Sequence, residues 1–179
     1  TTQPTPQAFA DGYYKLAAET VEILGGTVAS KLSGTYQSAT GGKSLMTKRC
    51  RVEVIDSQTV AMGLGLIVLA AAKKAQAGVK LNELFDFVSK SLSRSHLIIY
   101  FDTLKYLAKG GRIGKAQGLL GAMLMVKPIL TVKDGEIAPL TRVRSLAVGM
   151  DYIYRAVAGL SPVEALAVEH TTNPADAER

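Results

Sequence analysis

The sequence predicts a two-domain α/β protein, with a parallel sheet between two helical layers and then a second α/β domain of helices and a hairpin. Two patterns lead to this prediction. Strand-like and helix-like segments alternate over the first hundred residues, which is typical of a three-layer fold with a parallel sheet. After Phe101 the order becomes helix, helix, hairpin, helix and strand. We therefore expect domains over residues 1–101 and 102–179.

The first predicted domain begins with an amphipathic helix. Thr5-Pro6 is a helix start, since threonine can cap a helix and proline is favoured at its first position. Apolar residues at spacings of three and four extend this helix to about Leu24, and Gly25-Gly26 ends it. The later expected elements are strands near 27–29 and over 51–56 and 96–101, and helices over 35–47, 62–76 and 81–92.

The second predicted domain is identified by its turn residues. Asp134-Gly135 joins two extended runs, at 128–133 and 136–142, and this dipeptide is the strongest short-range signal for a β-hairpin. The residues before and after the hairpin have helical patterns. The other expected elements are a helix over 103–109 capped by Asp102, helices over 115–125 and 145–158, a strand over 165–169, and a helix start at Asn173-Pro174.

Composition limits the classes of protein that the chain can represent. Its 179 residues are 47% hydrophobic and 20% charged, which is ordinary for a globular protein and excludes a disordered chain. The single cysteine, Cys50, excludes an internal disulfide and a multi-cysteine metal site. The longest apolar stretches, 61–72 and 118–126, are well short of the ~20 residues that span a bilayer. We therefore expect no stable membrane insertion.

The net charge of +6 makes nucleic acid a partner to consider. The excess of basic residues is spread over residues 47–155 without a long run of like charge, which is the pattern of an ordinary solvated surface. The sequence has no recognition-helix motif and no set of stacking aromatic residues. A basic nucleic-acid-binding regulator is therefore an alternative, and we expect no nucleic-acid partner.

Motifs for nucleotide binding and hydrolysis are incomplete. Gly63-Leu64-Gly65 lacks a convincing third glycine, and Gly42-Lys43-Ser44 lacks the earlier glycine of a P-loop. His96 and His170 lie outside any HExxH motif, and the chain has no GxSxG. A serine acyl hydrolase that uses Ser33 stays open as an alternative, although the sequence nominates no base for it.

The densest cluster of hydroxyl groups is the segment SKLSGTYQSA at 30–39, between a strand end and a helix start. Free backbone N–H groups and the positive end of the helix dipole favour an anion at such a place. Ser33 can therefore bind an anion or simply cap the helix, and the residues alone leave both interpretations open.

Six blocks of sequence follow one another in the order of a known family. The blocks are TTQPTP at 1–6, KLSGTYQSA at 31–39, VIDS at 54–57, DTLKYLAKGGRI at 102–113, KPIL and the Asp-Gly pair at 127–135, and RVR at 142–144. Together they resemble the DegV family of fatty-acid-binding proteins, and their order over residues 1–144 argues against chance agreement. Because members of that family are longer, we expect this chain to be an internal fragment that lacks the family's N-terminal and C-terminal segments.

The resemblance implies a cytoplasmic, non-enzymatic protein that holds one long-chain fatty acid between two α/β domains, with no cofactor or metal. In the family, hydroxyl groups hold the carboxylate, and these correspond here to Thr1 and Ser33, with Ser30 as a neighbour. Bacterial members present the bound fatty acid to the catalytic subunit of a fatty acid kinase, which forms an acyl phosphate. Arg112 and Arg144 match arginines that serve kinase interaction or phosphoryl contact.

The apolar tail of such a ligand needs an aliphatic tunnel. The run over 119–126 is suitable material, because its leucines and methionines adapt to chains of different length and bend. Spacing alone does not distinguish tunnel-lining residues from ordinary core in this run.

Overall fold

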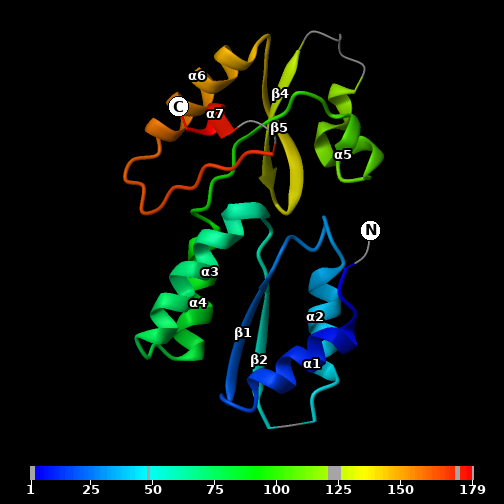
Figure 1. Ribbon diagram of the computed structural model, residues 1–179, viewed down its shortest axis with the longest axis vertical. Coiled ribbons are helices and arrows are strands. Elements are labelled where there is room, and N and C mark those ends of the chain that lie inside the picture. The colour runs from blue at the N-terminus through cyan, green and yellow to red at the C-terminus, as the bar shows by residue number, and fades with distance from the viewer. Residues whose placement is uncertain (1–2, 48, 121–125, 172–173, 179) are drawn as a thin grey trace.

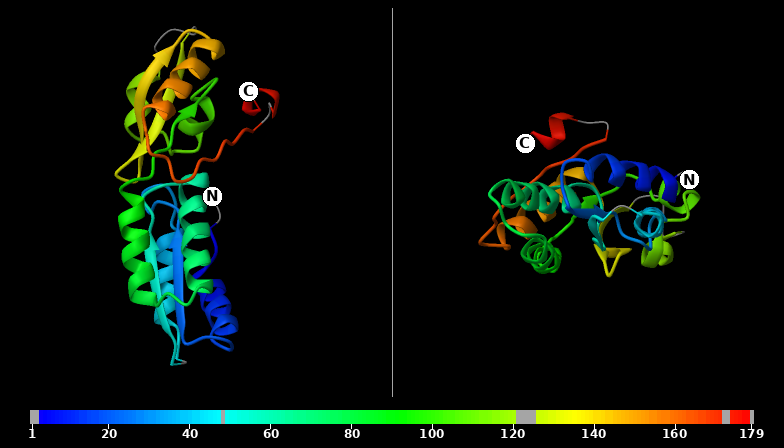
Figure 2. Two further views of the ribbon diagram at one scale, coloured as in Figure 1. Left: turned by 90° about the vertical axis from the view of Figure 1, so that its left-hand side faces the viewer. Right: turned by 90° about the horizontal axis from the view of Figure 1, so that it is seen from below.

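The computed structural model describes residues 3–47, 49–120, 126–171 and 174–178, which form two lobes, one above the other in Figure 1. The long axis of the molecule runs through both lobes (Figure 2). The first lobe contains α1 (Pro6–Leu16), β1 (Glu22–Thr27), α2 (Thr35–Ser44), β2 (Arg51–Asp56), α3 (Ala61–Gln76) and α4 (Leu81–Leu92). The second contains β3 (Ile99–Tyr100), α5 (Lys105–Lys109), the 3₁₀ helix η1 (Gly114–Leu119), β4 (Lys127–Lys133), β5 (Glu136–Val143) and α6 (Leu146–Ala158), and α7 (Pro174–Ala177) follows later in the chain.

The first lobe is a three-layer sandwich, as predicted. β1 and β2 pair in parallel, from Glu22 opposite Arg51 to Thr27 opposite Asp56. Helices α1 and α2 lie on one side of this sheet and α3 and α4 on the other (Figure 1). Each face buries its own apolar cluster. Tyr13, Ile23 and Val52 form the cluster under α1, and Ile55, Ile67, Ala71 and Val88 form the cluster under α3 and α4.

The first helix is shorter than predicted, because the residues after it form a strand. α1 ends at Leu16 rather than near Leu24, and β1 begins at Glu22. Pairing with β2 and burial of Ile23 override the helical spacing in this segment. Gly25-Gly26 lies inside β1 instead of ending a helix. Gly26 faces α3, since a Cβ at this position would lie 3.4 Å from Leu64 Cδ1, in ordinary van der Waals contact.

The second lobe is an antiparallel sheet in the order β3-β4-β5. The predicted hairpin is confirmed, since Asp134 and Gly135 both have positive φ, at 54° and 77°, as a type I′ turn requires. The predicted helix over 145–158 is also confirmed, and the Ser145 hydroxyl caps it by accepting the Val148 N–H at 3.4 Å. The core of this lobe contains Leu104, Ile113, Ala116, Leu130 and Ile137.

Two predicted elements at the start of the second lobe are shorter in the structure. The strand expected over 96–101 is only Ile99–Tyr100, because these two residues alone pair with β4. Helix α5 begins at Lys105, whose N–H is accepted by the Thr103 hydroxyl at 3.2 Å. Asp102 does not cap this helix, because its carboxylate pairs with Lys127 at 3.1 Å. β3 already belongs to the second sheet, although it comes just before residue 101. A domain boundary near residue 101 is kept as a proposal.

Two further predicted elements, the helix over 115–125 and the strand over 165–169, differ from the structure. The segment 114–119 is a 3₁₀ helix instead of the start of an α-helix, and residues 121–125 of that predicted helix lie outside the described residues. Residues 165–169 do not form the predicted strand. Instead, Glu164 pairs with Arg94 at 2.7 Å, and Glu169 accepts the Met62 N–H at 3.0 Å, so this segment is tied to α3 and α4. None of the helices in the described residues is long and apolar enough to cross a membrane.

Candidate functional site

The hydroxyl-rich segment forms a tight turn at the carboxyl end of the first sheet. We call residues 28–34, between β1 and α2, the serine loop. The Ala29 carbonyl accepts N–H groups from Leu32 at 2.9 Å and from Ser33 at 3.1 Å. Ser30 and Ser33 are three residues apart in this turn. The turn therefore brings together two of the predicted site residues.

Ser33 has hydrogen-bonding capacity beyond capping α2. Its hydroxyl lies 2.8 Å from the Thr35 hydroxyl, and it accepts the Thr35 N–H at a long 3.4 Å. Gly34 occupies the N-cap position and has no side chain to satisfy the first N–H groups of the helix. The start of α2 therefore offers hydroxyl and N–H donors to an anion.

Ser30 is engaged differently, because its hydroxyl already donates to a carboxylate. Asp56, the last residue of β2, accepts the Ser30 hydroxyl on Oδ2. Its Oδ1 accepts the N–H of Ser30 at 3.0 Å and that of Gln58 at 3.0 Å. In the sequence, the place of Asp56 at the end of a predicted strand is the one signal of this role.

The N-terminal segment lies against the start of α2. Thr1 is outside the described residues, but a Cβ on Gly34 would lie 2.6 Å from Gln3 Nε2, so Gln3 covers Gly34. Sequence reasoning did not identify Gln3. Tyr13 holds α1 against α2, since its hydroxyl donates to the Ala39 carbonyl at 3.2 Å. Burial raises the pKa of this hydroxyl. Gln3 of the first block and Gly34 of the second thus meet at the start of α2.

The second lobe contacts the serine loop directly. Leu32 packs against the apolar cluster of the second lobe. Arg112 Nε donates to the Leu32 carbonyl at 3.1 Å, and its Nη1 donates to the Gly110 carbonyl at 2.6 Å. At the hairpin turn, a Cβ on Gly135 would lie 3.7 Å from atoms of Ala29 and Lys31. The loop is therefore held between the two lobes.

The two predicted arginines lie at opposite ends of the second lobe. Arg112 contacts the serine loop, whereas Arg144 is exposed and follows the far end of β5. An eight-residue antiparallel strand is about 24 Å long from its first to its last residue, and β5 begins beside the loop. The structure thus brings Ser30, Ser33 and Arg112 together, and it places Arg144 elsewhere.

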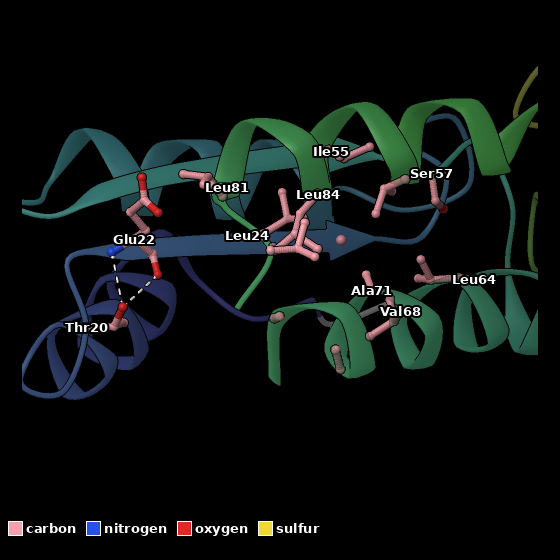
Figure 3. Close-up of a pocket in the computed structure, with 16 residues that line it drawn as sticks. Thr20, Glu22, Leu24, Ile55, Ser57, Leu64, Val68, Ala71, Leu81 and Leu84 are labelled. Atoms are coloured by element: carbon pink, nitrogen blue, oxygen red, sulfur yellow. Dashed lines mark hydrogen bonds between the residues drawn. The ribbon is translucent and has the colours of Figure 1, made fainter. Parts of the chain in front are cut away.

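A separate apolar cavity of about 330 Å³ lies between β1, α3 and α4 (Figure 3). One end has Ser57, whose hydroxyl donates to the Thr59 carbonyl at 3.2 Å, and the other end has Thr20 and Glu22. Its walls are aliphatic, with Leu24, Leu64, Val68, Ala71, Leu81 and Leu84 among them.

The expected tunnel run over 119–126 is described only in part. Leu119 packs against the second-lobe cluster, and Leu120 is 45% exposed. Residues 121–125 lie outside the described residues. In the part of the chain that the structure describes, no three His, Cys, Asp or Glu side chains gather into a set that could hold a metal ion.

Known proteins with similar sequences share the DegV domain. The family model described as "Uncharacterised protein, DegV family" matches residues 1–179. A DegV domain-containing protein of Clostridium perfringens is 38% identical over 159 residues, which are 87% of this chain and 56% of that protein. One of Streptomyces coelicolor is 36% identical over 178 residues, or 97% of this chain and 62% of that protein. The chain thus spans little more than half the length of these curated relatives.

Solved structures of DegV family proteins have a similar fold. A DegV family protein from Thermus thermophilus, described by its fatty acid binding, superposes with a TM-score of 0.83 at 33% identity, over 90% of this chain and 57% of that one. A fatty-acid-binding DegV family protein from Streptococcus agalactiae reaches a TM-score of 0.87 over 99% of this chain and 64% of that one. At 20% identity, the second likeness supports the fold alone. With the family model matched from end to end, the chain belongs to the DegV family.

Proposed function

We propose that this protein binds a long-chain fatty acid between its two lobes, with the carboxylate at Ser33 and the start of α2. The observation that carries the proposal is the position of the serine loop, which has donors at a helix start on one side and an apolar cluster on the other. An amphipathic ligand with one anionic end matches both features. The described fatty acid binding of the Thermus thermophilus relative supports this ligand class.

The carboxylate needs hydrogen-bond donors, because burying an unpaired charge is costly. The Ser33 hydroxyl and the uncapped N–H groups of α2 are the donors that the described residues provide. We extend the proposal to the Thr1 hydroxyl, which the family resemblance assigns to the same role. Ser30 enters as a neighbour, since its proton is already donated to Asp56.

The hydrocarbon tail supplies most of the binding free energy. Fourteen methylene groups transferred from water contribute roughly 11 kcal/mol, before the cost of association is subtracted. Between the lobes, the tail would contact Leu32 and the cluster around Leu104 and Leu119. The structure also describes an apolar cavity between β1, α3 and α4, so the experiment must distinguish a tail bound between the lobes from a tail bound in that cavity.

We also propose that the bound fatty acid is presented to a fatty acid kinase. A carboxylate oxygen would attack the terminal phosphorus of a nucleoside triphosphate, and the nucleoside diphosphate would leave. Arg144 is exposed and is therefore available to a partner. Arg112 also supports the loop through the Leu32 carbonyl, so we expect its replacement to affect both kinase-dependent phosphorylation and fatty acid binding.

The test is a palmitate titration with Ser33→Ala, after native mass spectrometry of the wild-type protein has shown whether a fatty acid co-purifies. Loss of a hydrogen bond to a charged group is worth ~1–3 kcal/mol, so affinity should fall by about 5- to 160-fold. Ser44→Ala is the matched control, because Ser44 lies exposed at the opposite end of α2. Equal affinity in wild type and Ser33→Ala would refute the carboxylate assignment.

A second variant locates the tail. Ala75 lines the β1–α3–α4 cavity from an exposed position, so Ala75→Phe narrows that cavity with little damage to the core. A tail between the lobes predicts unchanged palmitate affinity in this variant. A clear loss of affinity would place the tail in the cavity instead.

A further inference from the structure

The proposed fatty acid binding does not by itself explain the hydrogen bonds of the Asp56 carboxylate. It ends β2, and its carboxylate accepts three hydrogen bonds, two from Ser30 and one from Gln58. Among the ion pairs of the described residues, none includes Asp56. Hydrogen bonds therefore stabilise this charge, and all of them come from the two loops at the carboxyl end of the first sheet.

These bonds join the serine loop to the loop that follows β2. Gln58 has a φ of 51°, a left-handed conformation that is unfavourable for a residue other than glycine. Its N–H bond to Asp56 helps to hold that conformation. The Ala29 N–H donates to the Thr59 carbonyl at 2.9 Å, so the two loops are linked a second time beside Asp56. Asp56 thus fixes the backbone from which Ser33 extends.

Asp56 also determines what Ser30 can offer to a ligand. A serine hydroxyl has one proton, and the proton of Ser30 is directed to Asp56 Oδ2. The Ser30 oxygen can therefore only accept further hydrogen bonds. A carboxylate ligand is also an acceptor, so Ser30 has no proton to donate to it. Ser33 has no carboxylate partner among the described residues and can turn its proton towards a ligand.

We propose that Asp56 is a positioning residue for fatty acid binding, one that sets the serine loop through Ser30 and leaves Ser33 as the donor to the ligand. This inference rests on the proposed function. The geometry of the Asp56 carboxylate is what matters, because its negative charge by itself opposes the approach of another carboxylate.

Two conservative variants separate geometry from charge. Asp56→Asn keeps one oxygen that accepts both N–H groups, and its amide N–H can donate to the Ser30 oxygen, so the loop contacts persist without the charge. Asp56→Glu keeps the charge but moves the carboxylate by one methylene group, which disturbs all three bonds. Asp56→Ala removes the acceptor altogether.

The experiment is calorimetric titration of palmitate into the wild-type chain and the Asn and Glu variants, with urea unfolding of each. We expect Asp56→Glu to bind about tenfold more weakly, the equivalent of one lost hydrogen bond to a charged group, and Asp56→Asn to bind more tightly than Asp56→Glu. Asp56→Ala is expected to resemble Asp56→Glu or be weaker.

The outcomes are distinguishable. If the wild-type protein does not bind palmitate, the proposed function fails. If it binds but Asp56→Glu is as tight as wild type, or if Asp56→Asn is weaker than Asp56→Glu, the positioning role is wrong. Amide hydrogen exchange at Ser30 and Gln58 provides a second readout, which should accelerate in Asp56→Glu more than in Asp56→Asn. Equal acceleration in both variants would also overturn the inference.

Discussion

Replacing Gly42 by alanine should destabilise the protein, although alanine is the better helix former. Gly42 is buried where α2 crosses α1. A Cβ at this position would lie 2.6 Å from Phe9 Cβ, 2.7 Å from the Pro6 carbonyl oxygen and 3.0 Å from the Ala10 nitrogen. Two of these atoms belong to the backbone, so no change of rotamer relieves the overlap. Helix α1 must therefore move away from α2.

The expected magnitude follows from two opposing terms. Alanine in a helix interior gains ~1 kcal/mol over glycine, whereas overpacking a tight contact costs ~1–3 kcal/mol. Movement of α1 also strains the Tyr13 hydroxyl bond to Ala39 and the packing of Tyr13 on Ile23, and a lost hydrogen bond costs a further ~1 kcal/mol. We expect a net loss of about 1–3 kcal/mol, which in a protein of this size lowers Tm by roughly 2–12 °C.

Gly12 provides the matched control. It lies exposed within α1, and a Cβ there would have no atom within 4 Å. Gly12→Ala should therefore stabilise the protein, by up to ~1 kcal/mol. Urea denaturation of both variants measures the difference. Equal stability of Gly42→Ala and Gly12→Ala would refute the reasoning, because it would mean that the contact between α1 and α2 yields without cost.

Two further predictions concern pH and the hairpin turn. Hydrogen bonds from Lys43 and then Arg51 lower the pKa of Glu53 in the folded state, so the resulting stability is present above the unfolded-state pKa and is lost as the pH falls through the folded-state value. Urea unfolding between neutral and acidic pH should show a shallower loss in Glu53→Gln, and identical pH profiles would contradict this. Gly135→Ala places alanine at a φ of 77° and should cost ~1 kcal/mol in thermal unfolding. Gly78→Ala, at a φ of 87° with open space around it, should show a similar cost from strain alone, and a gain in stability at Gly135 would contradict the strain.

The elements that could be predicted from sequence are those with strong local signals. The Asp-Gly turn requires two positive φ values, and few other dipeptides adopt them. The strand Arg51–Asp56 and the helix Leu81–Leu92 have clear periodicities and have the predicted bounds. β1 was misread as helix because its evidence is non-local. Glu22–Thr27 becomes a strand by pairing with residues 29 positions later in the chain.

In the candidate site too, local features could be predicted from sequence, and contacts between residues far apart in the chain could not. The hydroxyl groups next to a helix start indicate Ser33 as an anion-binding or capping residue, whereas its carboxylate role and the neighbouring place of Ser30 are predicted by the family resemblance. Asp56 was missed as a partner of Ser30, since the two residues are separated by 26 positions. The bond from Arg112 to Leu32 crosses 80 positions and joins the two lobes. Such contacts depend on how the sheets are placed, and no local pattern specifies them.

If the fatty acid binds as proposed, the position of the serine loop links ligand binding to the contact between the lobes. On the first lobe, Asp56 holds the loop through its bond to Ser30. On the second lobe, Arg112 and the cluster that packs against Leu32 hold it. A fatty acid that binds Ser33 only when the loop is held must bind the docked arrangement more tightly than any separated one. By linkage, the ligand then stabilises the docked arrangement by the same free energy with which docking strengthens its binding. Under the proposed function, Arg112 would therefore act on the carboxylate site through the loop, independently of the proposed contact with a kinase.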